Sequence, residues 1–247
     1  MTDRRRHYSY TAYADPEMAR TFEERRFGGT IGEYVAAEQA AVLQEFAGEV
    51  RGRTVLDVGT GTGRAALLLA RLGGKVTGVD PSEAMLGVAR ARAMQLAASV
   101  RFLPGDAQAL SFEDRAFEVV VSLRVLMHTP LWTQSLAELC RVASRAVIVD
   151  YPSARSFALW QSLGRKVLYT CGVRTEPYRV FRDADIEREF RSHAFRIRSI
   201  HRQFVLPIAL HKALGSRYVT EWSEGFLERV GLLKLCGSPV TVLAERA

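Results

Sequence analysis

The stretch that decides the fold is VLDVGTGTG, Val55–Gly63. It continues an apolar run, Thr54–Val58, which predicts a buried strand, and it precedes the alanine- and leucine-rich segment Arg64–Leu72, which predicts a helix ending before Gly73-Gly74. A glycine-rich turn between a strand and a helix lets the backbone approach a ligand closely and directs helix N–H groups towards it. The stretch therefore predicts a ligand site at the start of an α/β domain.

Two details separate this turn from a dinucleotide-binding motif. The G-x-G-x-x-G fingerprint needs its third glycine at position 64, where this chain has Arg64, and the third glycine is Gly63 instead. Asp57 lies two residues before the first glycine, and its carboxylate would repel a pyrophosphate. An acid here suits a ligand that carries an ammonium and a sulfonium group, and S-adenosylmethionine carries both.

Two further acids follow the next predicted strands. Asp80 follows the strand predicted over Lys75–Val79, and an acid at this strand end can accept hydrogen bonds from two ribose hydroxyls. Asp106 follows the strand predicted over Val100–Leu103, and it can accept a hydrogen bond from an adenine amine. Each of the three acids thus lies at or just after the end of one of three successive predicted strands.

Strands and helices alternate over the first 150 residues. This alternation predicts βαβ units and a parallel sheet with helices on both faces. The remaining elements expected from periodicity are helices over Thr30–Ala47, Ala84–Leu96 (with Ser82 as its N-cap), Thr133–Val142 and Asp183–His193, strands over Phe117–Ser122, Arg145–Asp150, Arg196–Val205 and Val240–Glu245, and a helical stretch of about His211–Leu235 between the last two strands.

The chain resembles the class I S-adenosylmethionine-dependent methyltransferases, especially the group that includes the ubiquinone and menaquinone biosynthesis enzymes. Four motifs, which agree in order, spacing and character, carry the resemblance: Val55–Gly63, Val79–Leu86, Gly105–Ala107 and Phe117–Ser122. The resemblance implies a Rossmann-like methyltransferase fold, with a mostly parallel seven-stranded sheet, one antiparallel strand near the C-terminus and helices on both faces. It also implies S-adenosylmethionine as the cofactor and S-adenosylhomocysteine as the product.

The resemblance further implies a role for each motif. Asp57 would hold the methionine moiety with Ser122 beside it, and Asp80 would hold the ribose. The other implied contacts are the backbone of Gly59, Thr60, Gly61 and Gly63 at the methionine moiety, Met85 on the adenine face, and Asp106 and Ala107 at the adenine edge. One position departs from the family, which has Phe-Asp-Val-Val where this chain has Phe117–Val120 with Glu118.

Catalysis of methyl transfer needs few protein groups. An in-line displacement from a sulfonium requires alignment and exclusion of water, and a general base only if the acceptor loses a proton. His128, in the loop after the fourth strand, is the candidate base; alternatively it caps or packs the following helix. Tyr13 and His7 in the N-terminal segment are further candidates, and Tyr151 after the fifth strand is a candidate for lining the acceptor pocket.

The whole chain, 1–247, is expected to form a single domain. Residues 1–50 would form an N-terminal helical cover, residues 51–150 the cofactor-binding core, and residues 151–180 and 206–237 insertions on the acceptor side. Together with Phe204–Leu210, the insertions would enclose an apolar-lined cavity at the carboxyl ends of the strands, with His128 at its floor.

The insertion after Asp150 leaves two interpretations open. A helix over Arg155–Tyr169 would place Phe157, Trp160 and Leu163 on one face. This face either packs on the sheet domain, or it forms a lid over an apolar acceptor or a surface that seeks anionic lipid.

Composition limits the partners and the compartment. The net charge of +7 comes with arginines spread along the chain, and this pattern gives no firm nucleic-acid signal. The three cysteines, Cys140, Cys171 and Cys236, are too few and too widely spaced for a disulfide framework or a zinc site, so no metal is expected. Without an apolar leader or a run of roughly 20 apolar residues, a cytoplasmic protein is expected.

These features predict an S-adenosylmethionine-dependent methyltransferase acting on a small, partly hydrophobic molecule. The alternative is an RNA or protein methyltransferase that uses the basic surface. An amino-methylating nucleic-acid enzyme would carry an Asn-Pro-Pro-Tyr motif after the fourth strand, where this chain has Ser122–Val125, SLRV. Peripheral contact with a membrane is a further expectation, and the oligomeric state stays open.

Overall fold

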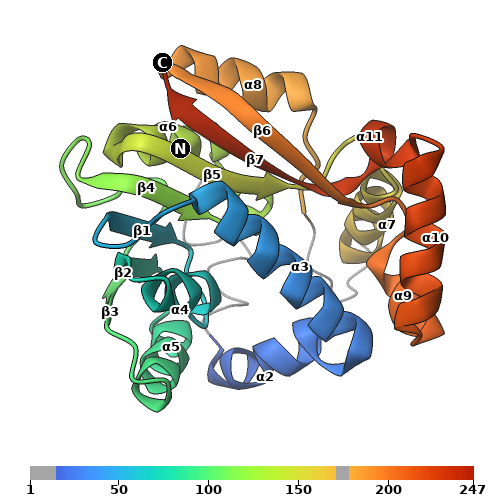
Figure 1. Ribbon diagram of the computed structural model, residues 1–247, viewed down its shortest axis with the longest axis horizontal. Helices are drawn as coiled ribbons and strands as arrows, with labels where there is room; N and C mark the ends of the chain where they lie inside the picture. Colours follow the sequence, from blue (N-terminus) through green and yellow to red (C-terminus); the bar gives the residue numbers. More distant parts are fainter. Residues whose placement is uncertain (1–14, 171–177) are drawn as a thin grey trace.

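The computed structural model describes residues 15–170 and 178–247. One seven-stranded sheet in the order β3-β2-β1-β4-β5-β7-β6 runs through the molecule (Figure 1). Strands β1 to β5 pair in parallel, and β7 is antiparallel to both of its neighbours, β5 and β6, which confirms the predicted fold. The strands are β1 Thr54–Val58, β2 Lys75–Asp80, β3 Val100–Pro104, β4 Phe117–Ser122, β5 Ala143–Tyr151, β6 Phe195–Phe204 and β7 Ser238–Arg246.

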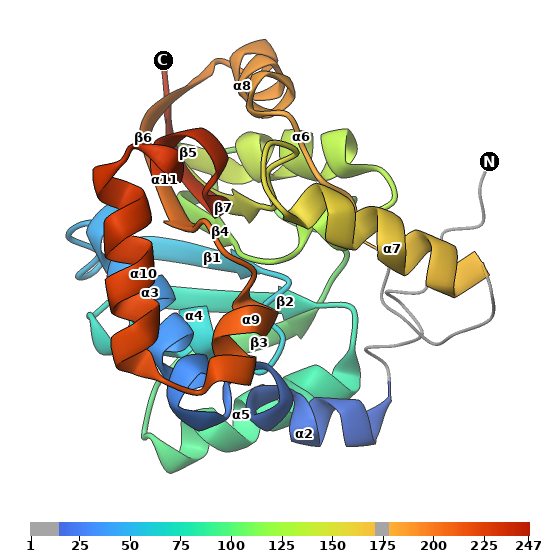
Figure 2. The same ribbon diagram turned by 90° about the vertical axis from the view of Figure 1, so that its right-hand side faces the viewer.

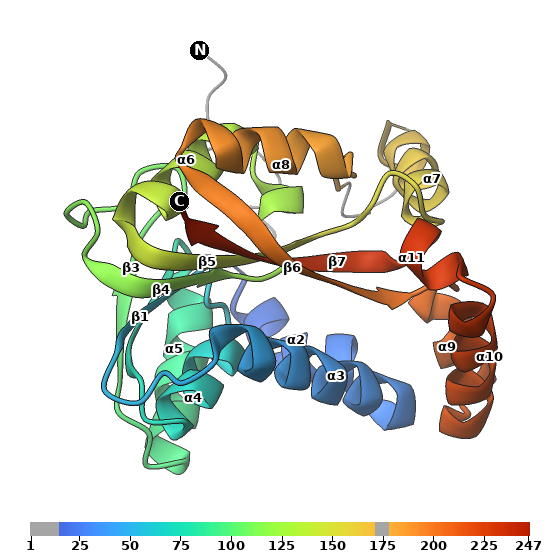
Figure 3. The same ribbon diagram turned by 45° about the horizontal axis from the view of Figure 1, so that its top comes forward.

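Helices cover both faces of the sheet (Figure 3). Side chains alternate across the sheet, so Val119 and Val121 of β4 pack with α3, α4 and α5, whereas Val120 packs on the opposite face with α6 and α8. Each face thus has its own apolar core. The helices named are α3 Gly29–Ala47, α4 Arg64–Arg71, α5 Glu83–Gln95, α6 Trp132–Val142 and α8 Asp183–Ser192.

Two helical regions differ from the sequence prediction. Helix α2, Pro16–Phe27, was not predicted, because its first turn relies on the Asp15 N-cap and Pro16 while only Ala19 is buried. The predicted stretch His211–Leu235 is three helices, because Gly215 (φ 64°) and Gly231 (φ 83°) adopt the left-handed conformation that ends a helix. The three are α9 Ile208–Leu214, α10 Arg217–Arg229 and α11 Leu232–Cys236.

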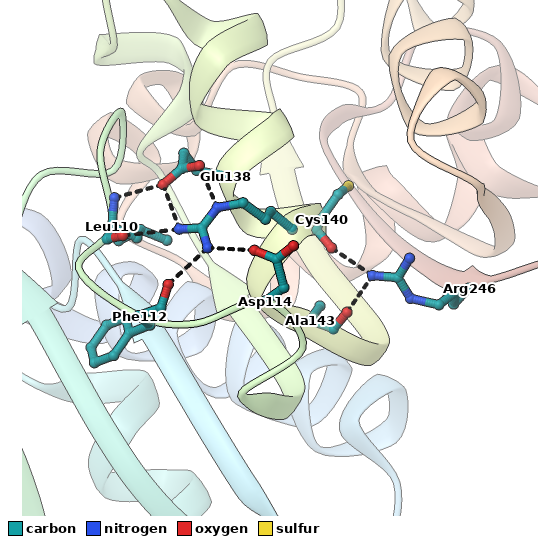
Figure 4. A network of polar contacts seen from close by, with 8 residues as sticks. Leu110, Phe112, Asp114, Glu138, Cys140, Ala143 and Arg246 are labelled. Carbon is teal, nitrogen blue, oxygen red and sulfur yellow. Dashed lines mark hydrogen bonds and ion pairs between the residues drawn. The ribbon is translucent and has the colours of Figure 1, made fainter.

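Two arginines, Arg141 and Arg246, form hydrogen bonds near the amino-terminal ends of β4 and β5 (Figure 4). The Arg246 guanidinium donates to the carbonyls of Cys140 and Ala143 at 2.8 and 2.5 Å, where α6 leads into β5. Arg141 donates to four groups around it: the carboxylates of Glu138 and Asp114 and the carbonyls of Leu110 and Phe112. These hydrogen bonds hold the pKa of Glu138 below its ordinary value. This end of the sheet is thus a rigid base opposite the carboxyl ends of the strands.

The described residues contain no helix long and apolar enough to cross a membrane. They also contain no group of three or more His, Cys, Asp or Glu side chains arranged to hold a metal ion.

Candidate functional site

The turn after β1 has a shape that depends on glycine. Gly59, Gly61 and Gly63 have φ of 71°, 53° and 83°, a region that other residues rarely adopt. A β-carbon on Gly59 would also overlap with the Val125 side chain from the loop after β4. The turn therefore brings the ends of β1 and β4 into contact.

The amide groups of this turn are already used within the protein. The N–H groups of Gly59 and Thr60 donate to the Val79 carbonyl at 2.8 and 2.9 Å, that of Gly61 to the Asp80 carboxylate at 2.9 Å, and that of Gly63 to the Thr60 carbonyl at 2.9 Å. These four amides are therefore engaged within the protein, and the predicted contact of the turn's backbone with the methionine moiety stays a prediction. The turn can instead present carbonyl oxygens, which accept hydrogen bonds from an ammonium group.

Asp57 is buried at the end of β1 and shapes the start of α4. Its Oδ2 accepts hydrogen bonds from the Thr60 hydroxyl at 2.7 Å and from the Ala66 amide at 3.1 Å. Burial raises the pKa of this carboxyl from 3.8 to about 6, against the lowering effect of those hydrogen bonds. A cation bound beside Asp57 would favour its ionised form, so the site is suited to a positively charged ligand group.

Asp80 lies at the end of β2, in register beside β1. Its Oδ1 accepts from the Ser82 amide and its Oδ2 from the Gly61 amide, both at 2.9 Å. Burial raises the pKa of Asp80 above its ordinary value. Two backbone donors fix the carboxylate, and each oxygen still has a lone pair with which to accept a ligand hydroxyl.

The three predicted acids meet in one cavity of about 260 Å³ at the carboxyl ends of the strands. Because β1, β2 and β3 pair in parallel, Asp57, Asp80 and Asp106 fall on the same edge of the sheet. The predicted cofactor residues that line this cavity are Asp57, Gly59, Thr60, Gly61, Asp80, Met85, Asp106 and Ala107.

Two predicted cofactor residues lie elsewhere. Ser122 is fully buried, and its hydroxyl donates to the Val58 carbonyl at 3.0 Å, so it ties β4 to β1 outside the cavity wall. Gly63 also lies outside the lining; a β-carbon there would come within 3.1 Å of Ala89 and 3.2 Å of Phe102. Both residues support the packing behind the site, and the wall itself is formed by Leu123, Arg124 and Val125.

Helix α2 covers the cavity, as expected for part of the N-terminal cover. Glu23 fastens it to the glycine turn: its carboxylate accepts the Thr62 hydroxyl and pairs with Arg64 at 3.4 Å and Arg92 at 3.2 Å. Phe22, Arg26 and Phe27 of the same helix line the cavity, and the Arg64 guanidinium lies 3.6 Å from the centre of the Phe27 ring. Tyr13 and His7 lie outside the described residues.

A second cavity, of about 310 Å³, adjoins the first. Arg26, Phe27, Arg124 and His128 line both cavities. Phe157 and the segment Phe204–Ala209 form part of its far walls. Its described charged lining residues are five cations and one carboxylate: Arg25, Arg26, Arg124, Arg165, Lys212 and Asp150.

His128 lies on the 3₁₀ turn η2, Leu126–His128, where the two cavities meet, and only 8% of it is exposed. Tyr151 lines the second cavity, but its hydroxyl donates to Asp183 at 3.2 Å. Burial and this carboxylate raise the pKa of Tyr151 further above its ordinary value. The Tyr151 hydroxyl is therefore engaged within the protein, and the role of His128 as a base stays a prediction.

Arg124 and Asp150 are site residues that the sequence analysis missed. Arg124 has a positive φ of 62°, uncommon for a residue with a side chain, and its amide donates to the Asp150 carboxylate. Asp150 is buried at the carboxyl end of β5, and burial raises its pKa. The available signal was its position, because Asp150 ends a predicted strand next to the candidate site.

The match with a known sequence family agrees with this geometry. Residues 55–146, which span β1 to the first part of β5, match the family described as "Methyltransferase domain". The matched residues are similar to this domain, and they contain the glycine turn, the three acids of the first cavity and His128.

Curated relatives match part of the chain. A demethylmenaquinone methyltransferase from Thermus thermophilus is 37% identical over 105 residues, which cover 40% of this chain and 48% of the relative. A ubiquinone biosynthesis O-methyltransferase from Shewanella pealeana is 35% identical over 89 residues, covering 36% of this chain and 38% of the relative. The chain thus spans less than half the length of these relatives.

The fold extends further than the sequence match. A magnesium protoporphyrin IX methyltransferase from Synechocystis, solved with bound SAH, superposes with a TM-score of 0.65 over 96% of this chain and 99% of that one, at 21% identity. The residues inside and outside the family match therefore belong together to one known fold.

Proposed function

We propose that this chain is an S-adenosylmethionine-dependent methyltransferase whose acceptor is a small, partly hydrophobic molecule. The observation that carries the proposal is the pair of adjoining cavities that meet at His128, one lined by the three strand-end acids and the other by the apolar insertions. A transferase needs its donor and its acceptor side by side, and this arrangement provides two neighbouring binding spaces.

The residues of the first cavity fit the cofactor. Asp57 and the carbonyl groups of the glycine turn would hold the ammonium group, and Asp80 would accept from the ribose hydroxyls. Met85 would pack on the adenine, and Asp106 with Ala107 would contact its edge. The bound cofactor would supply an activated methyl group, so the protein's task is to align the acceptor and exclude water.

The second cavity would hold the acceptor in line with the donor. Its walls include the apolar side chains of Val35, Met127, Phe157 and Phe204. His128 would take the proton of an acceptor hydroxyl as the new bond forms, and Arg26 and Arg124 favour an acceptor that bears negative charge near the transfer point. These bounded walls favour a small molecule over RNA or a protein side chain as the acceptor.

Transfer of a labelled methyl group tests the proposal. The purified chain is incubated with methyl-labelled S-adenosylmethionine and a cell extract, which is then separated into organic-soluble, RNA and protein fractions. Label should enter the organic-soluble fraction, and His128→Ala should reduce its rate by about 10²-fold or more. Label in RNA or protein, or in no fraction although the cofactor binds, would contradict the proposal.

A further inference from the structure

The exposed large hydrophobic side chains gather at one end of the molecule. Among the described residues, all but Met94, Leu96, Leu131 and Ile200 lie between Phe157 and Tyr169 or between Leu210 and Leu235. These two segments form α7, Ala158–Thr170, and α9 to α11, which lie at the end of the molecule that faces the viewer in Figure 2. A protein that meets only water rarely concentrates its exposed apolar surface in this way.

Helix α10 is amphipathic, but its polar face points inward and its apolar face points outward. Its inward face is polar: Thr220 is fully buried, and Glu224 accepts hydrogen bonds from the amides of Val205 and Leu206 at 2.8 and 2.9 Å. Glu224 also contacts the buried ring of His211 at 2.8 Å, and the Thr220 hydroxyl contacts the other ring nitrogen at 3.1 Å.

The opposite face of α10 is aromatic and exposed. Tyr218, Trp222 and Phe226 recur at intervals of four residues, and they are 77, 66 and 53% exposed. The Trp222 and Phe226 rings stack with centroids 6.3 Å apart. The buried polar groups fix the helix in place, so the aromatic face cannot turn inward.

Helix α7 has the same reversed polarity. Its Ser162 is buried and donates to the Tyr178 carbonyl at 2.6 Å. Trp160, Leu163 and Val167 are 71, 46 and 62% exposed. The interpretation that this apolar face packs on the sheet domain is therefore wrong.

We propose that α7 and α10, with α9 between them, form a docking surface for a bilayer that contains anionic lipid. Two of the chain's three tryptophans, Trp160 and Trp222, lie on it, and tryptophan and tyrosine favour the membrane interface. Basic residues outnumber acidic ones on these helices and α11: Arg165, Lys212, Arg217, Arg229 and Lys234 against Glu221, Glu224 and Glu228. Glu221 pairs with Arg217 at 2.7 Å, and Glu224 faces inward, where it accepts hydrogen bonds from backbone amides. An apolar face with aromatic and basic residues is typical of peripheral binding to anionic membranes.

The surface also borders the mouth of the second cavity. Phe157, Gln161 and Arg165 of the α7 region and Leu206–Ala209 with Lys212 of the α9 region line that cavity. Docking would thus place the acceptor cavity against the bilayer, where a lipophilic molecule is concentrated. A second copy seated on the same face would cover this mouth and bring two sets of cations together, so a lipid surface is the better fit.

Flotation with lipid vesicles tests the docking surface with the full chain. The wild type should bind vesicles of phosphatidylcholine with phosphatidylglycerol, bind less at high salt, and bind phosphatidylcholine alone more weakly. The double variant Trp160→Gln, Trp222→Gln should lose about tenfold or more in partitioning. The matched control Met94→Gln, Leu96→Gln alters two exposed apolar residues elsewhere, 82 and 52% exposed, and should bind like the wild type.

Three results would overturn the docking surface: no binding by the wild type, equal binding by the tryptophan variant, or a dimer that this variant dissociates in the absence of vesicle binding. Calorimetry with S-adenosylhomocysteine on the same samples separates this proposal from the proposed function. Cofactor binding without vesicle binding removes only the docking surface, and vesicle binding without cofactor binding removes only the transferase.

Discussion

The helices on the two sides of the molecule bury opposite kinds of side chain. On the side of the first cavity, α4 and α5 bury apolar residues such as Leu69 and Leu86, and backbone amides donate to the buried carboxylates of Asp57 and Asp80. On the side of the second cavity, α7 and α10 bury Ser162 and Thr220 and expose tryptophan. The first side holds buried carboxylates beside a cavity, and the second presents apolar side chains to its surroundings.

The largest effect on the free energy of unfolding should come from adding a side chain where the turn after β1 contacts the loop after β4. Gly59→Val adds a side chain at φ 71° that overlaps with Val125, and we expect it to lower the free energy of unfolding by about 3 kcal/mol or more. Gly61→Ala is the matched control, because its φ is also positive but nothing lies within 4 Å of its added β-carbon. It should cost about 1–2 kcal/mol. Equal losses in a denaturant titration would refute the importance of the Gly59–Val125 contact.

The next effect concerns ligand binding on the cofactor side. Asp80→Ala removes the acceptor of the Gly61 and Ser82 amides and the proposed ribose contacts, so affinity for S-adenosylhomocysteine should fall by about 10- to 100-fold. Asp185→Ala, a change on α8 at a residue that lines neither cavity, is the control and should leave the affinity unchanged. Calorimetry that shows the same affinity for both variants would remove Asp80 from the site.

The buried Asp57 predicts a pH dependence with a defined sign. Its pKa is raised from 3.8 to about 6 in the folded, empty protein, so folding takes up a proton between these values, and stability falls as pH rises through this window. Cofactor binding should change in the opposite direction, becoming tighter as pH rises through about 6, because the ionised carboxylate faces the ammonium group. The burial-raised pKa of Asp80 acts in the same direction.

Asp57→Asn provides the check on this pH dependence. It should flatten the dependence of stability between pH 4 and 6 and make the empty protein more stable at pH 7 by about 1–3 kcal/mol, while cofactor affinity falls. Thermal unfolding and calorimetry across the pH range measure both quantities. An unchanged pH profile of stability in the variant would show that Asp57 is ionised throughout.

The smallest effect on the free energy of unfolding should come from the exposed apolar faces of α7 and α10. Trp222→Gln exposes no new apolar surface, so we expect its free energy of unfolding in the absence of lipid to stay within about 0.5 kcal/mol of the wild type. Leu69→Gln on α4 is the comparison, because this side chain is fully buried and its replacement should destabilise the fold by about 3 kcal/mol or more. A large loss in Trp222→Gln would show that the ring is packed against the protein.

The sequence correctly predicted that the three acids meet, because the information for this is local. Each acid follows its own strand directly, and parallel pairing alone brings Asp57, Asp80 and Asp106 to one edge. Roles that depend on packing could not be predicted in this way. Ser122 was expected beside the methionine moiety, but its hydroxyl donates to the Val58 carbonyl. The Arg124–Asp150 contact joins residues from the ends of two different strands.

The acceptor side was predicted only in part. The spacing of Phe157, Trp160 and Leu163 predicted the helix and its apolar face, but not the direction in which that face points. Periodicity cannot distinguish an ordinary amphipathic helix from a reversed one, since both have the same pattern. The direction is set by tertiary contacts, such as those of Glu224 with the Val205 and Leu206 amides, which no local signal reveals.

A crystal structure of the chain with S-adenosylhomocysteine tests the central claim most directly. The account predicts the ligand in the first cavity, with its ribose at Asp80, its amino group at Asp57 or the glycine turn, and its sulfur facing His128 and the second cavity. A ligand bound elsewhere, or one whose sulfur points away from the second cavity, would contradict the claim that donor and acceptor meet at His128.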